Sequence, residues 1–146
     1  MKLRAEPARP HDLRGALELL GRSELTEQDV AESWGHYFVV HEDDGRVVGV
    51  AGLEVHGQDG LLRSVAVDSE YRGQGLGASL VEVAMTRAKR LSLRSVYLLT
   101  TTARDYFARQ GFADCSRDEA PEPIRQSWEF RVGCPSTAAF MKRAVA

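Results

Sequence analysis

The chain contains 146 residues, of which 43% are apolar and 27% are charged, and its formal net charge is −2. A chain of this length forms one domain and can bury roughly 70% of the surface that it exposes when unfolded. We therefore expect a single domain over residues 1–146. The slightly negative charge disfavours a nucleic-acid-binding protein, because such proteins usually carry an excess of basic residues on one face.

Cysteine content and hydropathy exclude further classes. Cys115 and Cys134 are too few for a disulfide framework, and no spacing of Cys and His supports a zinc site or another metal site. No apolar run approaches the roughly 18 residues of a membrane-spanning helix. The first residues lack the apolar core of a signal peptide. We therefore expect a protein of the reducing cytoplasm that does not act at a membrane.

The first half of the chain predicts two helices and three meandering strands. A short strand over 2–6 precedes a helix over 10–21, in which Leu13, Leu17 and Leu20 recur at helical spacing. Thr26 as an N-cap predicts a second helix over 26–33. Three strands follow, joined by Gly-containing turns, over 36–42, 46–56 and 61–67.

The second half alternates between helix and strand. A helix is predicted over 75–91, with Leu76, Leu80, Val83, Ala84, Ala88 and Leu91 on one side. The apolar strand that follows it is expected to be buried on both faces. In order, the remaining elements are this strand over 94–100, a helix over 103–110, a strand over 112–116, a helix from Pro121 to about 131 and a strand over 136–144. The order predicts a mixed α/β sheet.

The most informative segment is a turn with three glycines, Arg72–Gly77, between the strand over 61–67 and the helix over 75–91. Backbone N–H groups at a helix start, together with the helix dipole, form a site for phosphate groups. No Lys-Ser or Lys-Thr follows the glycines, as a Walker A loop would require, and Leu80 stands where a Rossmann fingerprint would need another glycine. A tight strand-to-helix turn without a ligand is the remaining alternative.

Residues 65–77 of this chain resemble the coenzyme A motif of the GNAT family of N-acetyltransferases. The family pattern Gln/Arg-x-x-Gly-x-Gly/Ala is met by Arg72, Gly75 and Gly77, and the later strand, helix and Gly111-Phe112 pair match as well. The resemblance implies an α/β fold with a splayed, mostly antiparallel sheet of six to seven strands and about four helices. The sheet would open between the strands over 61–67 and 94–100.

The same resemblance implies that acetyl-CoA is the co-substrate and that no metal takes part. Pantetheine would pair with the backbone of Ala66 and Val67, and the pyrophosphate would lie on the amides of Gly73 to Gly77. The cofactor-binding residues implied in this way are Val65, Ala66, Val67, Arg72, Gly73, Gln74, Gly75, Leu76, Gly77, Ala78 and Phe107.

A narrower resemblance lies near the end of the chain. The stretch PEPIRQSWEFRVGCPSTAAFM is similar to the tails of the arsenic-resistance N-acetyltransferases and of N-acetylglutamate synthases. It suggests a setting, arsenic resistance, more than a substrate. We expect a small amine as the acceptor, for example an amino acid or an amino-acid-like toxin. Protein or peptide N-acetylation and a non-catalytic acyl-CoA sensor are the alternatives. The sequence leaves the oligomeric state open, with a homodimer as one option.

Direct attack by the amine requires a base to remove its proton and a donor for the leaving thiolate. Glu54 is the first candidate for the base, the alternative being a solvated edge carboxylate; Glu129 is the second, the alternative being an ordinary helix-surface charge. Tyr106 is the candidate donor, although many relatives carry their tyrosine at the position of Phe107. One residue turns a helical side chain by about 100°, so Tyr106 facing the core, with protonation by solvent, is the alternative.

Substrate contacts are expected from Arg63, Ser64 and Thr100. Neighbouring strand residues face opposite sides, so either Arg63 or Ser64 should face the acceptor. A guanidinium can hold an acceptor carboxylate in bidentate fashion, and a structural ion pair is the alternative for Arg63. Thr100 would contact pantetheine or substrate, or else cap the helix that begins at 103.

Overall fold

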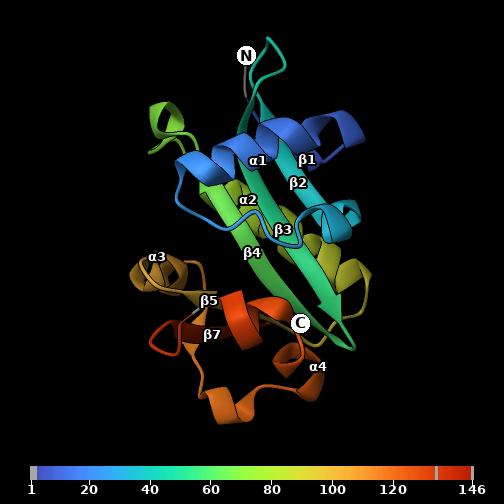
Figure 1. Cartoon of the computed structure of the whole chain (residues 1–146), viewed down its shortest axis with the longest axis vertical. Helices are drawn as coiled ribbons and strands as arrows, with labels where there is room; N and C mark the ends of the chain where they lie inside the picture. The colour runs from blue at the N-terminus through green and yellow to red at the C-terminus, as the bar shows by residue number, and fades with distance from the viewer. Residues whose placement is uncertain (1–2, 134, 146) are drawn as a thin grey trace. The chain divides into compact units, whose positions relative to one another are not determined.

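The computed structural model describes residues 3–133 and 135–145, so Cys134 lies outside the described residues. Seven strands form one mostly antiparallel sheet in the order β1-β2-β3-β4-β5-β7-β6 (Figure 1). The strands are β1 Ala5–Pro7, β2 Tyr37–His41, β3 Val47–His56, β4 Asp59–Val67, β5 Ser95–Thr100, β6 Ala113–Asp114 and β7 Ala139–Ala144. The expected mixed α/β fold is confirmed. In this part of the chain, no helix is long and apolar enough to cross a membrane.

Among the described residues, four α-helices connect the strands, together with shorter helical turns. The α-helices are α1 Leu13–Arg22, α2 Leu76–Arg90, α3 Arg104–Arg109 and α4 Glu122–Arg125. The shorter turns are η1 Pro10–Asp12, η2 Ala31–His36, η3 Ser69–Tyr71, η4 Arg117–Glu119 and η5 Glu129–Gly133.

The helix predicted over 26–33 is wrong. The Thr26 hydroxyl accepts a hydrogen bond from the Gln28 amide at 3.0 Å, but Asp29 then adopts φ 66°, a left-handed conformation that stops a right-handed helix. A short 3-10 helix, η2, follows instead.

The chain divides into two compact units. Residues up to Leu53 together with Ser64–Thr86 form one unit, and Glu54–Arg63 together with the residues from Arg87 onward form the other. Strands β3 and β4 and helix α2 each contribute residues to both units.

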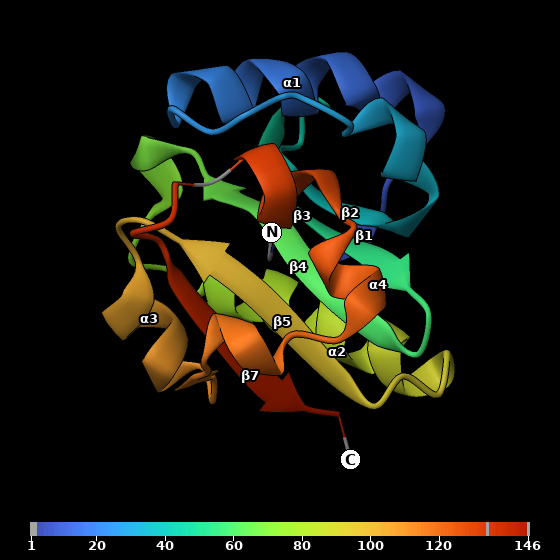
Figure 2. The same ribbon diagram turned by 60° about the horizontal axis from the view of Figure 1, so that its bottom comes forward.

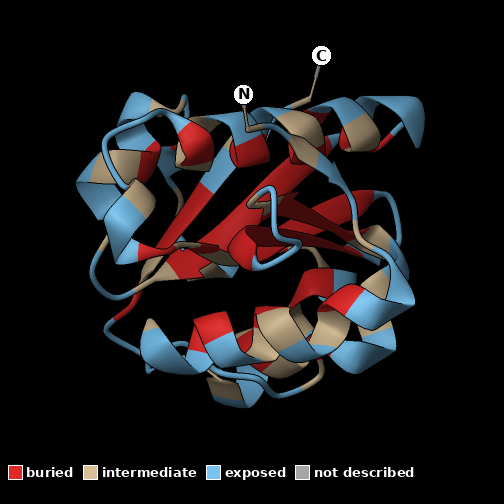
Figure 3. Cartoon of the chain, turned by 90° about the horizontal axis from the view of Figure 1, so that it is seen from above, coloured by how far each residue is buried: buried red, intermediate tan, exposed pale blue. Residues whose placement is uncertain are grey.

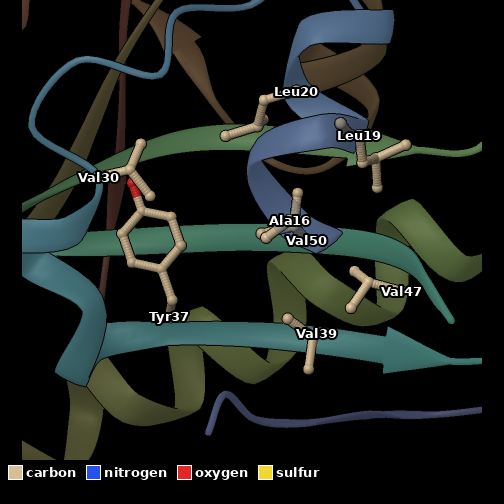
Figure 4. Packing of buried hydrophobic residues seen from close by; sticks show 9 residues of the cluster. Ala16, Leu19, Leu20, Val30, Tyr37, Val39, Val47 and Val50 are labelled. Carbon is tan, nitrogen blue, oxygen red and sulfur yellow. The ribbon is translucent and has the colours of Figure 1, made fainter. Parts of the chain in front are cut away.

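The core of the first unit forms where α1 packs on β2 and β3 (Figure 4). Burying a leucine or valine side chain contributes roughly 1.5–3 kcal/mol, so this cluster is a main source of the unit's stability. Its members are Ala16, Leu19, Leu20, Val30, Tyr37, Val39, Val47, Val50 and Ala66.

Tyr37 has a specific place in this core. Tyr37 is paired with Gly52 across β2 and β3, and a Cβ added at Gly52 would lie only 2.2 Å from Cζ of the tyrosine ring. Position 52 is therefore a glycine because the ring occupies the space of a side chain. Trp34 stacks on the same ring with the centroids 5.1 Å apart.

The second unit is built on β5 and β7, which pair antiparallel along their length. Strand β4 joins β5 in parallel at Gly60–Val96 and Leu61–Tyr97. Tyr97 stacks on Phe140 at 5.3 Å, and Ile124 of α4 completes the core of this unit, so that α4 lies against these two strands (Figure 2).

The helix predicted from Pro121 to about 131 is divided into two. Helix α4 ends at Arg125, and the Ser127 hydroxyl donates to the Ile124 carbonyl at 2.7 Å. Such a side-chain bond competes with the helical hydrogen-bond pattern. The chain resumes as the wide turn η5, which begins at Glu129.

Burial follows the expected pattern on most elements (Figure 3). Strand β5 is buried from Ser95 to Leu99, as its apolar sequence predicts. Leu91 is an exception to the predicted apolar side of α2, because it is 41% exposed. Helix α2 ends at Arg90 and Ser92 adopts φ 59°, so Leu91 lies beyond the helical repeat.

Candidate functional site

The glycine-rich loop leads directly into α2. Gly73 and Gly75 have φ values of 80° and 79°, a left-handed conformation that favours glycine, and nothing lies within 4 Å of a Cβ built on either residue. The Gly75 carbonyl accepts the Ser79 amide at 3.0 Å, so the hydrogen bonds of α2 start here. The first amides of a helix have no partner within the helix, and this loop therefore presents N–H groups beside open space.

Other residues predicted to bind the cofactor frame this loop. Leu76 is buried and anchors the first turn of α2, while Gln74 is exposed between the two left-handed glycines. The Arg72 side chain turns back, and its Nε donates to the Val67 carbonyl at 3.2 Å. Val65, Val67, Gly77 and Ala78 are half-buried and Ala66 is buried.

Asp68 fixes the start of the loop. Its carboxylate accepts the Glu70 amide at 3.0 Å and pairs with Arg22 at 3.2 Å. The hydrogen bond from the Glu70 amide, with that from Arg22, holds the pKa of Asp68 below its ordinary value. The carboxylate therefore stays ionised and keeps the end of β4 tied to α1.

Strand β4 contains a backbone irregularity at Ser64. Its φ of 60° is left-handed, a conformation that costs roughly 1–3 kcal/mol for a residue other than glycine. The Ser64 hydroxyl is hydrogen-bonded to the Tyr37 hydroxyl at 2.9 Å. This contact supplies part of the surrounding structure that such a conformation needs to persist.

Arg63 is the centre of a buried cluster of charges. Its Nη1 donates to Oε2 of Glu54 at 2.8 Å, and its Nε lies 3.3 Å from Oε2 of Glu129. The side chain of Arg63 is only 1% exposed, and those of both glutamates are 8% exposed. Trp128 covers the guanidinium, with its ring centroid 6.0 Å from Cζ. Three residues proposed independently from the sequence thus meet in one place.

Glu54 also receives a second donor. Nε2 of His56 lies 2.9 Å from Oε1 of Glu54, so each carboxylate oxygen has its own partner. Burial acts to raise the pKa of Glu54, but the hydrogen bonds and charges of His56 and Arg63 outweigh burial and hold the pKa below its ordinary value. Glu54 is therefore ionised at neutral pH, as a proton acceptor must be.

Thr100 caps the helix that follows it, which was the alternative to a contact with pantetheine or substrate. Its Oγ1 accepts a hydrogen bond from the Ala103 amide at 3.0 Å, just before α3.

Tyr106 is half-buried against the edge of the Phe107 ring, with the centroids 5.2 Å apart. Burial raises the pKa of Tyr106 and outweighs the opposing charge of Arg109, so the phenol keeps its proton. Phe107 is 8% exposed and contacts Phe112 edge-on.

Sequence reasoning missed two members of the charged cluster. His56 comes two residues after Glu54 on one strand, which places both side chains on the same face. This spacing could have predicted that His56 lies beside Glu54. Trp128 is the neighbour of Glu129 in sequence, but nothing in the sequence indicated its contact with Arg63.

Cys115 is a half-buried free thiol whose pKa is raised by burial, which makes it a poor nucleophile at neutral pH. Within residues 3–133 and 135–145, no group of three or more His, Cys, Asp or Glu side chains is placed to hold a metal ion.

Curated relatives of this chain are named amino-acid acetyltransferases. The chain is 30% identical over 115 residues to that of Vibrio atlanticus, covering 77% of this chain and 24% of the relative. It is 32% identical over 120 residues to that of Pseudomonas putida, covering 75% of this chain and 27% of the relative. The chain thus spans about a quarter of the length of these relatives.

Solved structures show the same fold. N-acetylglutamate synthase from Neisseria gonorrhoeae, complexed with coenzyme A and N-acetyl-glutamate, superposes with a TM-score of 0.85 at 19% identity, over 100% of this chain and 36% of that one. Rv2747 from Mycobacterium tuberculosis, in complex with CoA and NLQ, gives 0.83 at 25% identity, over 96% and 98%. A family model described as the acetyltransferase (GNAT) family matches residues 5–112. The chain therefore belongs to the GNAT family of acetyltransferases.

Proposed function

We propose that this protein transfers the acetyl group of acetyl-CoA to the amine of an amino acid or a similar small molecule. The observation that carries the proposal is the loop at the start of α2, where two left-handed glycines leave open space beside the first amides of the helix. Membership of the GNAT family and CoA-bound structural neighbours support the same co-substrate. When bound, acetyl-CoA supplies an activated acetyl thioester.

The proposed acceptor follows from the relatives and from the charged cluster. The relatives are named amino-acid acetyltransferases. The buried cluster of Arg63 and two glutamates offers both a guanidinium for a carboxylate and carboxylates for an ammonium group. An acceptor carboxylate would have to compete with Glu129 for the Nε side of Arg63.

We propose Glu54 as the group that takes the proton of the amine. An alkyl ammonium group with a pKa of about 10.4 needs roughly 4–5 kcal/mol to lose its proton at pH 7. The low pKa of Glu54 makes it a weak base for a free ammonium ion. Glu54 therefore acts best as the nitrogen begins to bond to the acetyl carbon, because the nitrogen becomes more acidic at that moment.

The test is release of free thiol from acetyl-CoA with a panel of amines, with the acetylated product identified by mass spectrometry. Glutamate, glutamine, lysine, glycine and a short peptide cover acidic, neutral, basic and peptide acceptors. We expect turnover with at least one free amino acid and little with the peptide. Tight acetyl-CoA binding without turnover on any acceptor would instead indicate the acyl-CoA sensor.

The tail resemblance adds one more acceptor to this panel. The segment from Pro121 to Met141 is similar to the arsenic-resistance N-acetyltransferases, whose setting implies an amino-acid-like toxin. We propose an amino-acid-like toxin as a further acceptor to test, beside the amino acids that the names of the curated relatives indicate. Location in the cytoplasm and formation of a homodimer stay predictions from the sequence.

A further inference from the structure

Trp128 and Gly133 pack against each other across the wide turn η5. A Cβ built on Gly133 would lie 2.3 Å from Cζ3 and 2.7 Å from Cε3 of the indole, closer than side chains come in real structures. The φ of Gly133 is not left-handed, so its backbone conformation does not require glycine. Position 133 is therefore a glycine because the six-membered ring of Trp128 occupies the space of a side chain.

The backbone on both sides of Trp128 is anchored to the core of the second unit. The Ser127 hydroxyl accepts a hydrogen bond from the Phe130 amide at 3.3 Å, which bridges the backbone of Trp128. The Phe130 ring packs edge-on against Phe140 of β7, with the centroids 5.5 Å apart. The turn η5 is a π-helical turn, a rare element that occurs frequently at functional sites. The indole is thus held from its backbone and from its ring.

The anchored indole lies over the guanidinium of Arg63. Its ring centroid is 6.0 Å from Cζ of Arg63, a distance at which the π-electrons of the ring attract the cation. The side chain of Arg63 is only 1% exposed, whereas Trp128 is half-buried. The next residue, Glu129, contacts Nε of the same guanidinium at 3.3 Å. One short segment therefore both covers the cation and contacts it.

This cover has a consequence for the binding of a carboxylate by Arg63. The attraction between a guanidinium and a carboxylate is several times stronger in surroundings of low polarity than in water. Arg63 is buried in the folded protein before any acceptor arrives, so acceptor binding does not have to remove water from the guanidinium. Loss of the cover would admit water and weaken the attraction.

We propose that Trp128 is a positioning residue for recognition of the acceptor. Packed against Gly133, its indole keeps water from the Arg63 guanidinium, and Arg63 in turn holds the acceptor carboxylate. This inference rests on the proposed function, in which Arg63 meets that carboxylate. The proposed contacts of acetyl-CoA lie on the glycine-rich loop, so the effect should appear in KM for the amino acid and not in KM for acetyl-CoA.

Two substitutions and their combination test the contact, with the amino acid that turns over fastest as acceptor. Gly133→Ala puts a methyl group where the indole lies, so the ring must move, and KM for the amino acid should rise about tenfold. Trp128→Phe shortens the cover and should raise this KM about threefold. In the Trp128→Phe background, Gly133→Ala should add less than about twofold, because the ring atoms that the methyl group would meet are gone.

The chain offers a matched control for each substitution. Trp34, the other of the two tryptophans, stacks on Tyr37 in the first unit, and nothing lies within 4 Å of a Cβ built on Gly35. Trp34→Phe and Gly35→Ala should leave KM for the amino acid within about twofold of the wild-type value, and thermal melts establish that all variants fold. An unchanged KM in Gly133→Ala, or effects of the two substitutions that simply multiply, would overturn the proposal.

A measurement without turnover keeps this inference apart from the proposed function. In ¹⁵N-labelled protein, exchange of the Arg63 Nε–H with water reports how well the guanidinium is shielded. Exchange should be about tenfold faster in Gly133→Ala and Trp128→Phe than in the wild type, and unchanged in Trp34→Phe. Equal exchange in the wild type and both variants refutes the cover. Faster exchange in the variants of a protein that acetylates none of the amines counts against the proposed function alone.

Discussion

The guanidinium of Arg63 stabilises two buried carboxylates at once, and this is its main energetic role in the structure. Removing one partner from a buried ion pair typically costs about 3–5 kcal/mol, because an uncompensated charge stays in a medium of low polarity. Here the loss of Arg63 would remove the guanidinium that both Glu54 and Glu129 contact. The structure thus contains the ion pair that was the alternative to a substrate role for this residue.

Replacement of Arg63 by alanine should therefore lower the free energy of unfolding by about 3–5 kcal/mol. It should also reduce acetyl transfer to every acceptor, with acidic acceptors affected most if Arg63 holds their carboxylate. Urea denaturation and kinetics with glutamate and glycine measure the two effects. Arg104→Ala, which breaks an exposed pair with Asp114, is the control and should change stability little. A variant as stable as the wild type would contradict the buried-pair argument.

At Gly75, the expected effect of a side chain comes from the backbone and not from a clash. A Cβ at Gly75 meets nothing within 4 Å, but φ 79° costs roughly 1–2 kcal/mol for an L-residue. Gly75→Ala should rearrange the loop and raise KM for acetyl-CoA about tenfold, with kcat nearly unchanged.

Gly21→Ala on α1 is the matched control for that substitution. Its Cβ also meets nothing within 4 Å, and its φ is not left-handed. Alanine favours a helix over glycine by up to about 1 kcal/mol, so this variant should be as stable as the wild type or more so. Calorimetric titration with CoA distinguishes the two variants, and equal affinities in both would argue against a phosphate role for the loop.

Individual residues were predictable from the sequence to different degrees. Glu54 and Arg63 could be singled out because both lie on strands beside the glycine-rich motif. The contact of Arg63 with Glu129 could not, because it joins residues 66 positions apart through the fold of the tail. Leu91 shows the same limit, since its exposure depends on where α2 ends.

Among the elements, β1, β2 and η1 are joined by a single imidazole. Nε2 of His41 lies 2.6 Å from Oδ1 of Asp12, and Nδ1 lies 3.1 Å from Oε1 of Glu6. Burial acts to lower the pKa of His41, but hydrogen bonds and charges from Asp12 and Glu6 outweigh burial and raise the pKa above 6.5. Burial acts to raise the pKa of Asp12, but His41 and the Arg9 amide bring it below 3.8.

The stability that this contact adds should depend on pH in a defined direction. A raised pKa for His41 means that its contribution is complete below about pH 6.5 and is lost as pH rises through the value in the folded protein. The lowered pKa of Asp12 means that its contribution is present above about pH 3.8 and is lost as pH falls through its folded value.

Chemical denaturation between pH 5.5 and 9 measures the loss of the His41 contribution as pH rises. The free energy of unfolding should fall as pH rises above 6.5 in the wild-type protein, and His41→Gln should remove most of that slope. Asp12→Asn should remove part of it, because the contact with Glu6 is kept. If the slope persists in both variants, another group is responsible for it.

Helices and strands with a strong hydrophobic periodicity were predictable from the sequence. Segments in which a single residue favours a turn over a helix were not. The strands at 46–56 and 94–100 and the helix at 75–91 agree with β3, β5 and α2 within a few residues. The predicted helices at 26–33 and after Pro121 failed where one residue, Asp29 or Ser127, favoured a turn. Propensity over a window does not register a single left-handed residue or a side chain that bonds to its own backbone.

For the whole molecule, binding of acetyl-CoA should add stability by mass action. A ligand at 100 times its Kd adds about 2.7 kcal/mol to the free energy of unfolding when it binds only the folded protein. For a chain of 146 residues this corresponds to a rise in Tm of about 5–10 °C. Both acetyl-CoA and CoA should produce it, because the proposed contacts are with the shared diphosphate.

Thermal melts with and without CoA check this expectation, and Gly75→Ala gives the comparison. The variant should show a smaller rise in Tm than the wild type at the same CoA concentration. Inorganic pyrophosphate at millimolar concentration should give a small rise in the wild type. A wild-type Tm that does not move with saturating CoA would contradict the use of this loop for phosphate binding.

The absence of a side chain at position 52 has an effect well beyond its own strand. The Tyr37 ring rests where a Gly52 side chain would be, and the hydroxyl at the far end of that ring touches the Ser64 hydroxyl. The Tyr37 ring therefore connects β2 and β3 to the left-handed residue Ser64 of β4. Even a methyl group at position 52 would displace the ring, and it would disturb the hydrogen bond that supports the left-handed backbone at Ser64.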